Sequence, residues 1–379
     1  MHRNGVYILI LSVLVLVSIG LVMLTSVGAF VPANQGNPAY FITRQLIFLL
    51  IGAGACIVAA RWDYRHWTKY AWVLVVVGFV LMMACFLPKV GVRMNDANRW
   101  LNLGFVTIQP MELAKIGLVA LLAFWMGTHQ KTIGGFLDGV VIPMGLLGCM
   151  GLLCAFQKDL GTASLMLLIV TLMMFIAGTR PAYLILMVMA GLAGIIVVAI
   201  HDPEKMDRLL AFLHPEQHKQ DGGYQIWMAL IAFGSGGLSG LGLGNGVQKM
   251  FYLPEAHTDC IFPIVGEELG LIVTLLVVFC FLLLALSGGY ISCHASDTTG
   301  LLLGFGVTAL ICLQAAMNMA VVTSLMPAKG IGLPFISYGG TNLLICLTCV
   351  GILLNIHRHA LYSPVKKRGA LPTMINERM

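Results

Sequence analysis

Residues 6–24 read VYILILSVLVLVSIGLVML, an apolar stretch without a charged side chain. A helix crosses the hydrocarbon core of a bilayer in about 20 apolar residues, so this stretch predicts a transmembrane helix. It is longer than the core of a signal peptide, which has about 7–15 residues, and no A-x-A cleavage site follows it. We therefore expect an uncleaved first span that starts on the cytoplasmic side.

The rest of the chain has the same apolar character. Of its 379 residues, 59% are hydrophobic and only 10% are charged, whereas soluble domains carry roughly a quarter charged residues. The composition is therefore typical of an integral membrane protein. The net charge of +6 does not indicate a nucleic-acid partner, because the basic residues are scattered through loops rather than gathered in one stripe.

Ten segments are apolar and long enough to cross a bilayer. They are residues 6–29, 44–61, 70–87, 110–127, 138–156, 161–178, 182–200, 262–287, 299–324 and 337–356. No soluble linker or low-complexity segment separates them. The expected fold class is an all-α membrane protein, a polytopic bundle of about ten transmembrane helices in a single integral membrane domain that covers residues 1–379.

The distribution of Lys and Arg predicts the orientation of the bundle, because short cytoplasmic loops are enriched in both residues. The basic segment 61–69 and the basic tail 357–379 fall on one side of a ten-span protein. We assign that side, with both termini, to the cytoplasm. The long segment 201–260, between the seventh and eighth spans, is then an extracytoplasmic loop.

Several cations fall on the outer side despite this bias. They are Lys89, Arg93, Arg99, Lys205, Arg208, Lys219, Lys249 and Lys329. Cations that are kept there indicate an anionic ligand. The alternative is that segment 201–260 is long enough to be translocated whatever its charge.

The segment that enters the fourth span, from Arg99 to Lys115, carries the first candidate site residues. Pro110 is typical of a helix start, because the N–H that it lacks has no helical partner there in any case. Glu112 and Lys115 are three residues apart and share one helix face. Ionisable residues inside a span are rare and indicate function, although an internal ion pair that joins helices gives the same pattern.

Three more segments on the outer side depart from regular spans. Asp159 lies in a tight turn, where it either caps the next helix or acts directly. Residues 234–246 hold too many glycines for a regular span, so we expect them to pack against protein or to line a polar cleft. No Gly-Lys-Ser/Thr follows them, which argues against a nucleotide-binding loop. Residues 327–342 predict either a fixed irregular loop or a simple hairpin before the last span.

Glu255, His257 and Asp259 alternate along the chain just before the eighth span. An Asp at the edge of an apolar slab loses solvation, which raises its pKa and makes it a better general base. The His-x-Asp pattern is also compatible with a metal site, although its other ligands are unspecified. A charged loop in water is the third interpretation.

Together these segments resemble the SEDS family (shape, elongation, division and sporulation proteins) over most of the chain. The resemblance is carried by Arg99-Trp100, Gln109-Pro110, Glu112, Lys115, residues 159–162, 234–237, 253–259 (LPEAHTD) and 333–340 (LPFISYGG). Residues 248–252, 266–270 and 329–330 are more similar to the cell-division branch of the family than to its elongation branch. The chain departs from the family pattern at Met111, Lys158, Met228, Ala229, Cys260 and Pro263.

The resemblance implies a peptidoglycan glycosyltransferase that polymerises lipid II into glycan strands at the outer face of the bacterial cytoplasmic membrane, during septal cell-wall synthesis. It implies a class B penicillin-binding protein transpeptidase and other divisome membrane proteins as partners. No residue is assigned to a metal or cofactor, and whether a divalent cation (Mg²⁺ or Mn²⁺) assists is left open. A lipid II flippase and a non-catalytic divisome scaffold are the alternatives.

In this interpretation Asp259 is the catalytic base, which takes the proton of the acceptor sugar 4-hydroxyl. Arg99, Lys115 and Lys249 are expected to hold the pyrophosphate, because positioned cations stabilise a developing negative charge. The other expected substrate-binding residues are Trp100, Gln109, Glu112, Asp159, Arg208, Glu255, His257, Lys329, Ser337 and Tyr338.

Overall fold

The computed structural model describes most of the chain. The described residues are 2–28, 39–94, 97–102, 104, 107–201, 212, 223–250, 252–327 and 329–362. Arg208, part of the long segment 201–260 and the tail beyond residue 362 lie outside the described residues.

Ten apolar helical segments correspond one for one to the ten predicted spans. They are α1 (His2–Gly28), α2 (Tyr40–Arg61), α4 (Ala71–Ala84), α5 (Pro110–Thr128), η2 (Leu137–Val141) joined to α6 (Ile142–Phe156), α7 (Leu160–Ala177), α8 (Pro181–His201), α11 (Ile261–Cys293), α12 (Thr298–Val322) and α13 (Gly340–Tyr362). Within the described ranges, 8 of these segments are long and apolar enough to cross a membrane, while α4 and the apolar part of α8 are shorter. The predicted fold class, a polytopic helical membrane protein, is confirmed.

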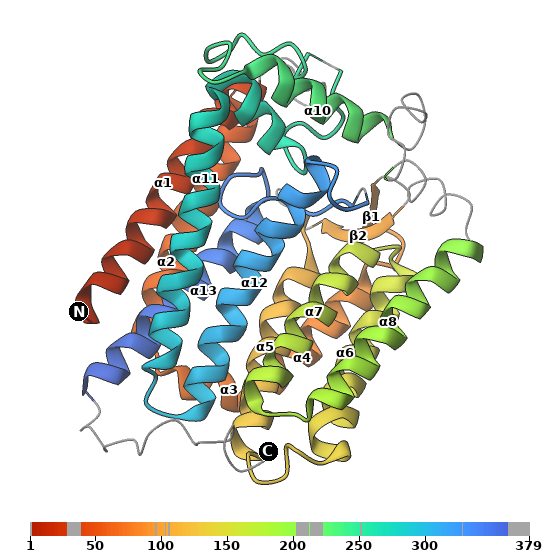
Figure 1. Cartoon of the computed structure of the whole chain (residues 1–379), viewed down its shortest axis with the longest axis vertical. Helices are drawn as coiled ribbons and strands as arrows, with labels where there is room; N and C mark the ends of the chain where they lie inside the picture. Colours follow the sequence, from red (N-terminus) through yellow and green to blue (C-terminus); the bar gives the residue numbers. More distant parts are fainter. Residues whose placement is uncertain are drawn as a thin grey trace.

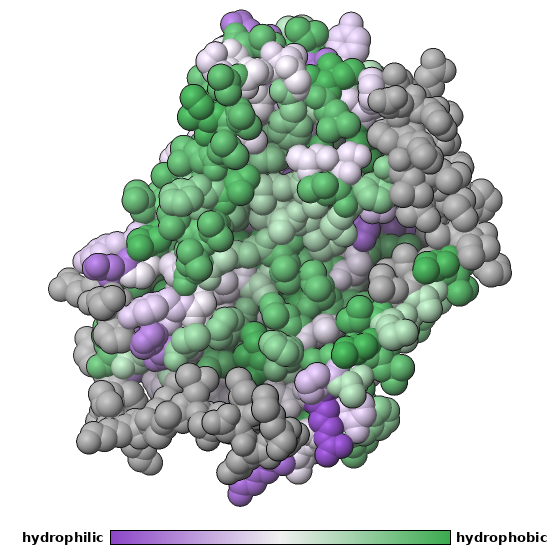
Figure 2. Space-filling view, in the orientation of Figure 1, coloured by the Kyte–Doolittle hydropathy of each residue, from purple (hydrophilic) through white to green (hydrophobic). Residues whose placement is uncertain are grey.

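The helices differ in how deeply they lie in the bundle. In α12, 72% of the apolar stretch is buried inside the bundle, whereas in α2 only 17% of it is buried. Side chains such as Leu50 on α2 and Ile272 on α11 are 74% and 68% exposed. Figure 2 shows apolar residues over most of the middle of one face, with hydrophilic residues towards its two ends. An apolar exterior of this extent is stable against lipid tails, so the chain is a multi-pass membrane protein.

Short elements mark the two ends of the bundle. At one end, hereafter the α10 end, lie α10 (Tyr224–Gly236) and an antiparallel sheet of β1 (Gly91–Met94), β2 (Ala97–Asn102) and β3 (Thr107–Ile108), in the order β1-β2-β3 (Figure 1). At the opposite end lies α3 (Tyr64–Lys69) (Figure 1). The sequence pattern predicts helices alone, because the strands of this sheet are too short to give an alternating pattern. Pairing across it satisfies the backbone of the loop between α4 and α5.

At the α3 end, polar contacts join segments that are far apart in the sequence. The Tyr64 hydroxyl donates a hydrogen bond to Asp297, at 2.8 Å, just before α12. The Asn355 side chain on α13 accepts from the Tyr64 N–H and donates to the carbonyl of Ala60, both at 2.9 Å. The loops after α2 and α11 therefore meet the second half of α13 on one side, as the alternating direction of the predicted spans requires.

α11 is interrupted at Gly270, which has φ 76° and ψ −178°. Backbone groups near the break bond to the glycine-rich loop 237–246 instead. Leu271 N–H donates to the Gly237 carbonyl (3.0 Å), and Leu241 N–H donates to the Glu267 carbonyl (2.9 Å). The prediction that this glycine-rich segment is irregular and packs against protein is therefore confirmed for the residues after α10. A broken helix in a membrane protein needs replacement partners of this kind.

The contact between α10 and α11 gives a test of this packing. A Cβ atom added at Gly236 would lie 2.0 Å from the Gly266 carbonyl oxygen, whereas one added at Gly234 meets nothing within 4 Å. We expect Gly236→Ala to lower the stability of the purified protein by about 1–3 kcal/mol, the usual penalty of overpacking. Gly234→Ala, two residues away on the same helix, is the matched control and should be neutral or slightly stabilising. Thermal unfolding in one detergent measures both, and equal melting temperatures would contradict the close packing.

Candidate functional site

A cavity of about 600 Å³ opens at the α10 end of the bundle. Its walls come from α2, β2, α5, α12 and the two irregular segments that precede α11 and α13. It brings together most of the site residues predicted from the sequence: Arg99, Trp100, Gln109, Glu112, Lys115, Glu255, His257, Asp259, Lys329, Ser337 and Tyr338. Side chains from segments more than 200 residues apart thus share one polar space inside an apolar bundle.

Asp259 lies in the turn that leads into α11. Its carbonyl accepts a hydrogen bond from the Asn318 side chain on α12, at 2.8 Å, which fixes the backbone at this point. Its carboxylate lies beside Gly330, because a Cβ atom added there would be 3.1 Å from Asp259 Oδ2 and 4.0 Å from Arg99 Nη1. The absence of a side chain at Gly330 therefore leaves the carboxylate and the guanidinium open to each other and to the cavity.

The electrostatic environment of Asp259 makes it a weak acid. Burial is the main cause that raises its pKa from 3.8 to about 7, and the carboxylates of Glu255 and Asp159 act in the same direction. Arg99 opposes them, since a nearby cation stabilises the carboxylate. The predicted rise in the pKa of Asp259 is confirmed, and a carboxyl group with this pKa can take up and release a proton near neutral pH.

Arg99 is held in place by the turn before α7. Its Nε donates to the carbonyl of Gln157 at 3.2 Å, and its Nη1 lies 3.9 Å from Asp159 Oδ1. Asp159 in turn accepts hydrogen bonds from the N–H (3.1 Å) and the hydroxyl (2.9 Å) of Thr162, so it caps α7. Of the two roles predicted for Asp159, the structure supports the cap, with an added role in orienting Arg99.

Lys329 and His257 occupy more apolar surroundings. The ammonium group of Lys329 donates to the Ser164 hydroxyl at 2.7 Å, and burial lowers its pKa. Burial also lowers the pKa of His257, whose ring lies 4.7 Å from the Phe41 ring and 6.0 Å from the Tyr338 ring. His257 therefore resembles a packed neutral imidazole more than a charged ligand.

The described residues do not form a preassembled metal site. In the described ranges, no group of three or more His, Cys, Asp and Glu side chains is placed to hold a metal ion. A divalent cation at Asp259 would need phosphate oxygens of a ligand to complete its coordination, which is a common arrangement for Mg²⁺.

The floor of the cavity is formed by Glu112 and Lys115 on α5 and Gln314 on α12. Lys115 Nζ is 2.7 Å from a Glu112 carboxylate oxygen and donates to Gln314 Oε1 at 2.9 Å. The second Glu112 oxygen is buried without a hydrogen-bond partner among the described residues. The ion pair that the sequence offers as an alternative is thus present, and the same pair also faces the cavity.

The segment before α13 is a fixed irregular loop, the first of the two alternatives predicted for it. Ser337 accepts a hydrogen bond from Leu333 N–H at 2.7 Å and donates to the carbonyl of Thr258. Tyr338 N–H donates to the carbonyl of His257 at 2.9 Å. These bonds tie the loop to the segment that carries Asp259.

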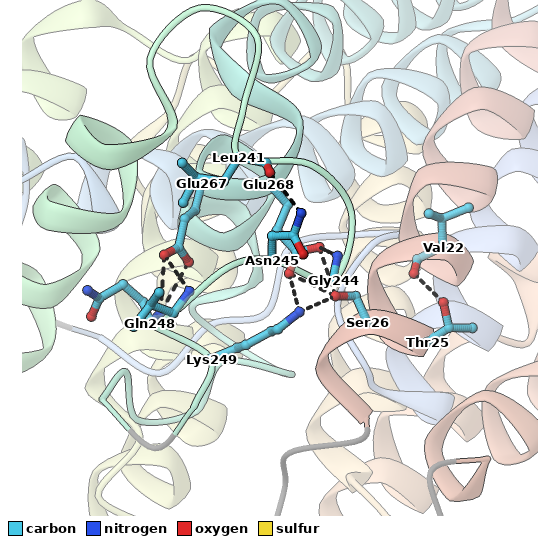
Figure 3. A network of polar contacts seen from close by, with 11 residues as sticks. Val22, Thr25, Ser26, Leu241, Gly244, Asn245, Gln248, Lys249, Glu267 and Glu268 are labelled. Carbon is cyan, nitrogen blue, oxygen red and sulfur yellow. Dashed lines mark hydrogen bonds and ion pairs between the residues drawn. The ribbon is translucent and has the colours of Figure 1, made fainter.

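Lys249 lies away from the cavity, in the polar network drawn in Figure 3. Its ammonium group pairs with the Glu268 carboxylate and donates to the Ser26 hydroxyl at 2.7 Å. Glu268 also accepts from Gly244 N–H at 3.0 Å. The structure therefore does not bring Lys249 to the predicted pyrophosphate site. Instead, Lys249 forms an ion pair with the buried Glu268 carboxylate on α11, which also joins the glycine-rich loop to α1.

Several residues of the site were not predicted from the sequence, among them Arg44 on α2, and Gln314 and Asn318 on α12. Gln314 and Arg44 line the cavity, and Asn318 donates to the carbonyls of both Asp259 and Ile331. The spacing of Gln314 and Asn318, four residues apart inside an apolar span, is the signal that predicts a shared polar face. Arg44 marks the start of the second span, where a cation is easily assigned to the membrane interface.

This geometry defines a class of membrane protein, namely a membrane-spanning helical bundle with a polar, cation-lined cavity at one end. A family described as cell cycle protein, FtsW/RodA/SpoVE, matches residues 7–362. The chain belongs to this family, which confirms the resemblance to SEDS proteins.

Relatives and solved structures agree with this assignment. The chain is 39% identical to the "Probable peptidoglycan glycosyltransferase FtsW" of Trichlorobacter lovleyi, over 96% of both chains. It is 36% identical to the stage V sporulation protein E of Bacillus subtilis, over 94% of this chain and 97% of the relative. The fold is similar to that in "Structural coordination of polymerization and crosslinking by a peptidoglycan synthase complex" (TM-score 0.75, 25% identity, 94% and 98% covered). It is also similar to Thermus thermophilus RodA (TM-score 0.66, 25% identity, 94% and 97% covered).

Proposed function

We propose that this protein is a peptidoglycan glycosyltransferase that polymerises lipid II into glycan strands. The observation that carries the proposal is the pair formed by Asp259, whose pKa is raised to about 7, and the neighbouring Arg99 in one cavity. A base and a cation side by side suit a reaction in which a hydroxyl loses a proton while a diphosphate leaves. Relatives named as probable peptidoglycan glycosyltransferases support the same activity.

The position of the cavity also suits an amphiphilic substrate. Lipid II carries its sugars and diphosphate on a polyprenyl tail, so its reacting bonds lie where the bilayer meets water. The cavity lies at one end of the bundle, and its wall residues Arg99 and Lys329 provide positive charge for a diphosphate. Trp100, Gln109 and Glu255 line the same space and are proposed to contact the sugars.

In the proposed reaction, Asp259 accepts the proton of the acceptor sugar 4-hydroxyl. The oxygen then attacks the anomeric carbon of the donor chain, a new C–O bond forms with inversion, and the bond to the diphosphate breaks. Undecaprenyl diphosphate leaves with the electron pair of that bond. Arg99 and Lys329 stabilise the charge on the leaving diphosphate, and Lys115 on the cavity floor adds a positive charge that Glu112 holds in place.

The protein is proposed to lie in the bacterial cytoplasmic membrane at the division septum, with the α10 end facing away from the cytoplasm and both termini in the cytoplasm. Support comes from Arg61, Arg65 and Lys69, which lie at the α3 end, where short cytoplasmic loops concentrate positive charge. A reporter enzyme fused after Tyr362 reads this orientation directly. Activity of a periplasm-dependent reporter at that point would reverse the assignment.

A class B penicillin-binding protein transpeptidase is the proposed partner, with other divisome membrane proteins. The fold is similar to that in a solved peptidoglycan synthase complex, which is described as coordinating polymerisation and crosslinking. Lipid II polymerisation by the purified chain, with and without this transpeptidase, tests the dependence. Equal rates in both samples, with no co-purification, would remove the partner from the proposal.

Replacing the carboxylate of Asp259 tests its role as the base. We expect Asp259→Asn to lower the rate of lipid II polymerisation by about 10²–10⁴, the usual contribution of a general base, because the amide cannot accept the proton. The measurement is glycan-strand formation from lipid II by the purified protein with its transpeptidase partner. Asp138→Asn, at the other end of the bundle, is the control and should retain normal activity.

The same experiment separates the rival functions. Near-normal polymer from Asp259→Asn would remove Asp259 from the proposed role. In sealed vesicles, translocation of labelled lipid II by the wild-type protein without any polymer would favour a flippase. Normal cell division by an Asp259→Asn strain would favour a scaffold. A flippase also requires polar access from both sides, whereas most of the gathered site residues lie at the α10 end.

The pKa of Asp259 predicts the pH dependence of polymerisation. A base must be deprotonated to act, so the rate should rise with pH through an apparent pKa of about 7 and fall away below it. Glu255→Gln removes a negative charge that raises this pKa, so the rising limb should move to lower pH. Arg99→Gln removes the cation that lowers the pKa, so the limb should move to higher pH. A profile that is unchanged in both variants would show that another group controls the rate.

A further inference from the structure

Arg44 is a cavity cation that the proposed reaction at Asp259 does not use. It lies one turn after the start of α2 and lines the cavity. Its guanidinium carbon lies 4.4 Å from the centre of the Tyr40 ring, and it hydrogen-bonds with the Tyr338 side chain. Among the described residues it takes part in no ion pair.

The other cavity cations differ from Arg44 in their surroundings. Arg99 lies 3.9 Å from Asp159, and Lys115 lies 2.7 Å from Glu112. Lys329 has a hydroxyl partner on α7. Arg44 belongs to an apolar span, where a charge without a counter-ion is costly and indicates function. The missing negative charge is therefore expected from a ligand in the cavity.

Arg44 also lies on a different wall from Arg99. Arg99 and Lys329 are tied to the α7 side, by the turn before α7 and by Ser164, and Arg99 acts on the carboxyl group of Asp259. Arg44 comes from α2 and lies next to the loop before α13, through Tyr338. Positive charge thus lines the cavity in two places, one beside the base and one on α2.

We propose that Arg44, with the Tyr338 hydroxyl, binds the diphosphate of the acceptor lipid, and that Arg99 and Lys329 bind the diphosphate of the donor. This inference rests on the proposed function, because a polymerase must hold two polyprenyl-diphosphate sugars at once. The leaving diphosphate is attached to the reacting carbon and must lie close to Asp259. The diphosphate of the acceptor is separated from its reacting 4-hydroxyl by a disaccharide, so it requires a cation farther from the base. A planar guanidinium suits this task, since it binds phosphate oxygens in a bidentate manner.

A binding experiment on a protein that does not turn over tests this assignment. Lipid II is titrated into purified Asp259→Asn in phospholipid-free detergent, and native mass spectrometry counts the bound lipid molecules. We expect two bound molecules, and we expect Arg44→Gln in the same background to weaken one of them roughly tenfold or more while the other is kept. Arg44→Lys should fall in between, because it keeps the charge and loses the fork geometry.

Arg93→Gln is the matched control, because Arg93 is an exposed cation in β1 at the same end of the bundle and is not part of the cavity wall. It should leave both binding events unchanged. Monodisperse elution and an unchanged melting temperature of Arg44→Gln exclude a folding defect, and a misfolded variant is replaced by Tyr338→Phe, which should weaken the same event. Two unchanged binding events in correctly folded Arg44→Gln or Tyr338→Phe would overturn the inference.

Two further measurements distinguish lipid II from a bilayer headgroup at this position, and lipid II binding from polymerase activity. If phosphatidylglycerol binds as tightly as lipid II at the Arg44-dependent position, that position holds a bilayer headgroup and the inference fails. If the wild-type protein makes no polymer but still binds two lipid II molecules, one through Arg44, the polymerase proposal fails while this binding site stands. If polymer forms and lipid II binding is independent of Arg44, the Arg44 binding site fails while the polymerase proposal stands.

Discussion

Two irregular segments at the α10 end, residues 252–260 and 329–339, are held together by two amide side chains of one helix. Asn318 donates to the carbonyls of Asp259 and Ile331, and Gln314 donates to the carbonyl of Gly332. Both side chains are almost fully buried in α12, at 2% and 1% exposure. Irregular backbone in a membrane protein is stable only when such partners replace water. The cavity exists because α12 supplies these partners.

The chemistry of the site follows from the same constraint. The segment that carries Asp259 is fixed against α12 and the loop before α13, and burial is the largest cause of the raised pKa of Asp259. Arg99 stays close without neutralising this effect, since Asp159 and the Gln157 carbonyl share its charge. Gly330 keeps the space between them open. A weak acid, a partly engaged cation and an open space between them are the parts that a sugar-transfer site at a membrane surface requires.

The number and positions of the spans could be predicted from the sequence, because each is a predominantly apolar run, and most of the predicted cavity residues are polar side chains at or near span ends. Lys249 shows where that reasoning stops. Its place in the chain suits an outer cation, but only the fold reveals that Glu268 binds it. Arg44 is the opposite case, a residue that looks like an interface anchor until α2 packs beside the loop before α13. The assignment of a residue to the cavity depends on helix packing, which hydropathy does not encode.

The central claim is that lipid II reacts in this cavity, with Asp259 at the reacting hydroxyl. An experimental structure of Asp259→Asn with lipid II bound in a lipid nanodisc tests it most directly. We expect sugar density in the cavity, a 4-hydroxyl within hydrogen-bond distance of residue 259, and diphosphate density against Arg99 or Arg44. Lipid II bound at the α3 end, or along the outside of the bundle with an empty cavity, would contradict it.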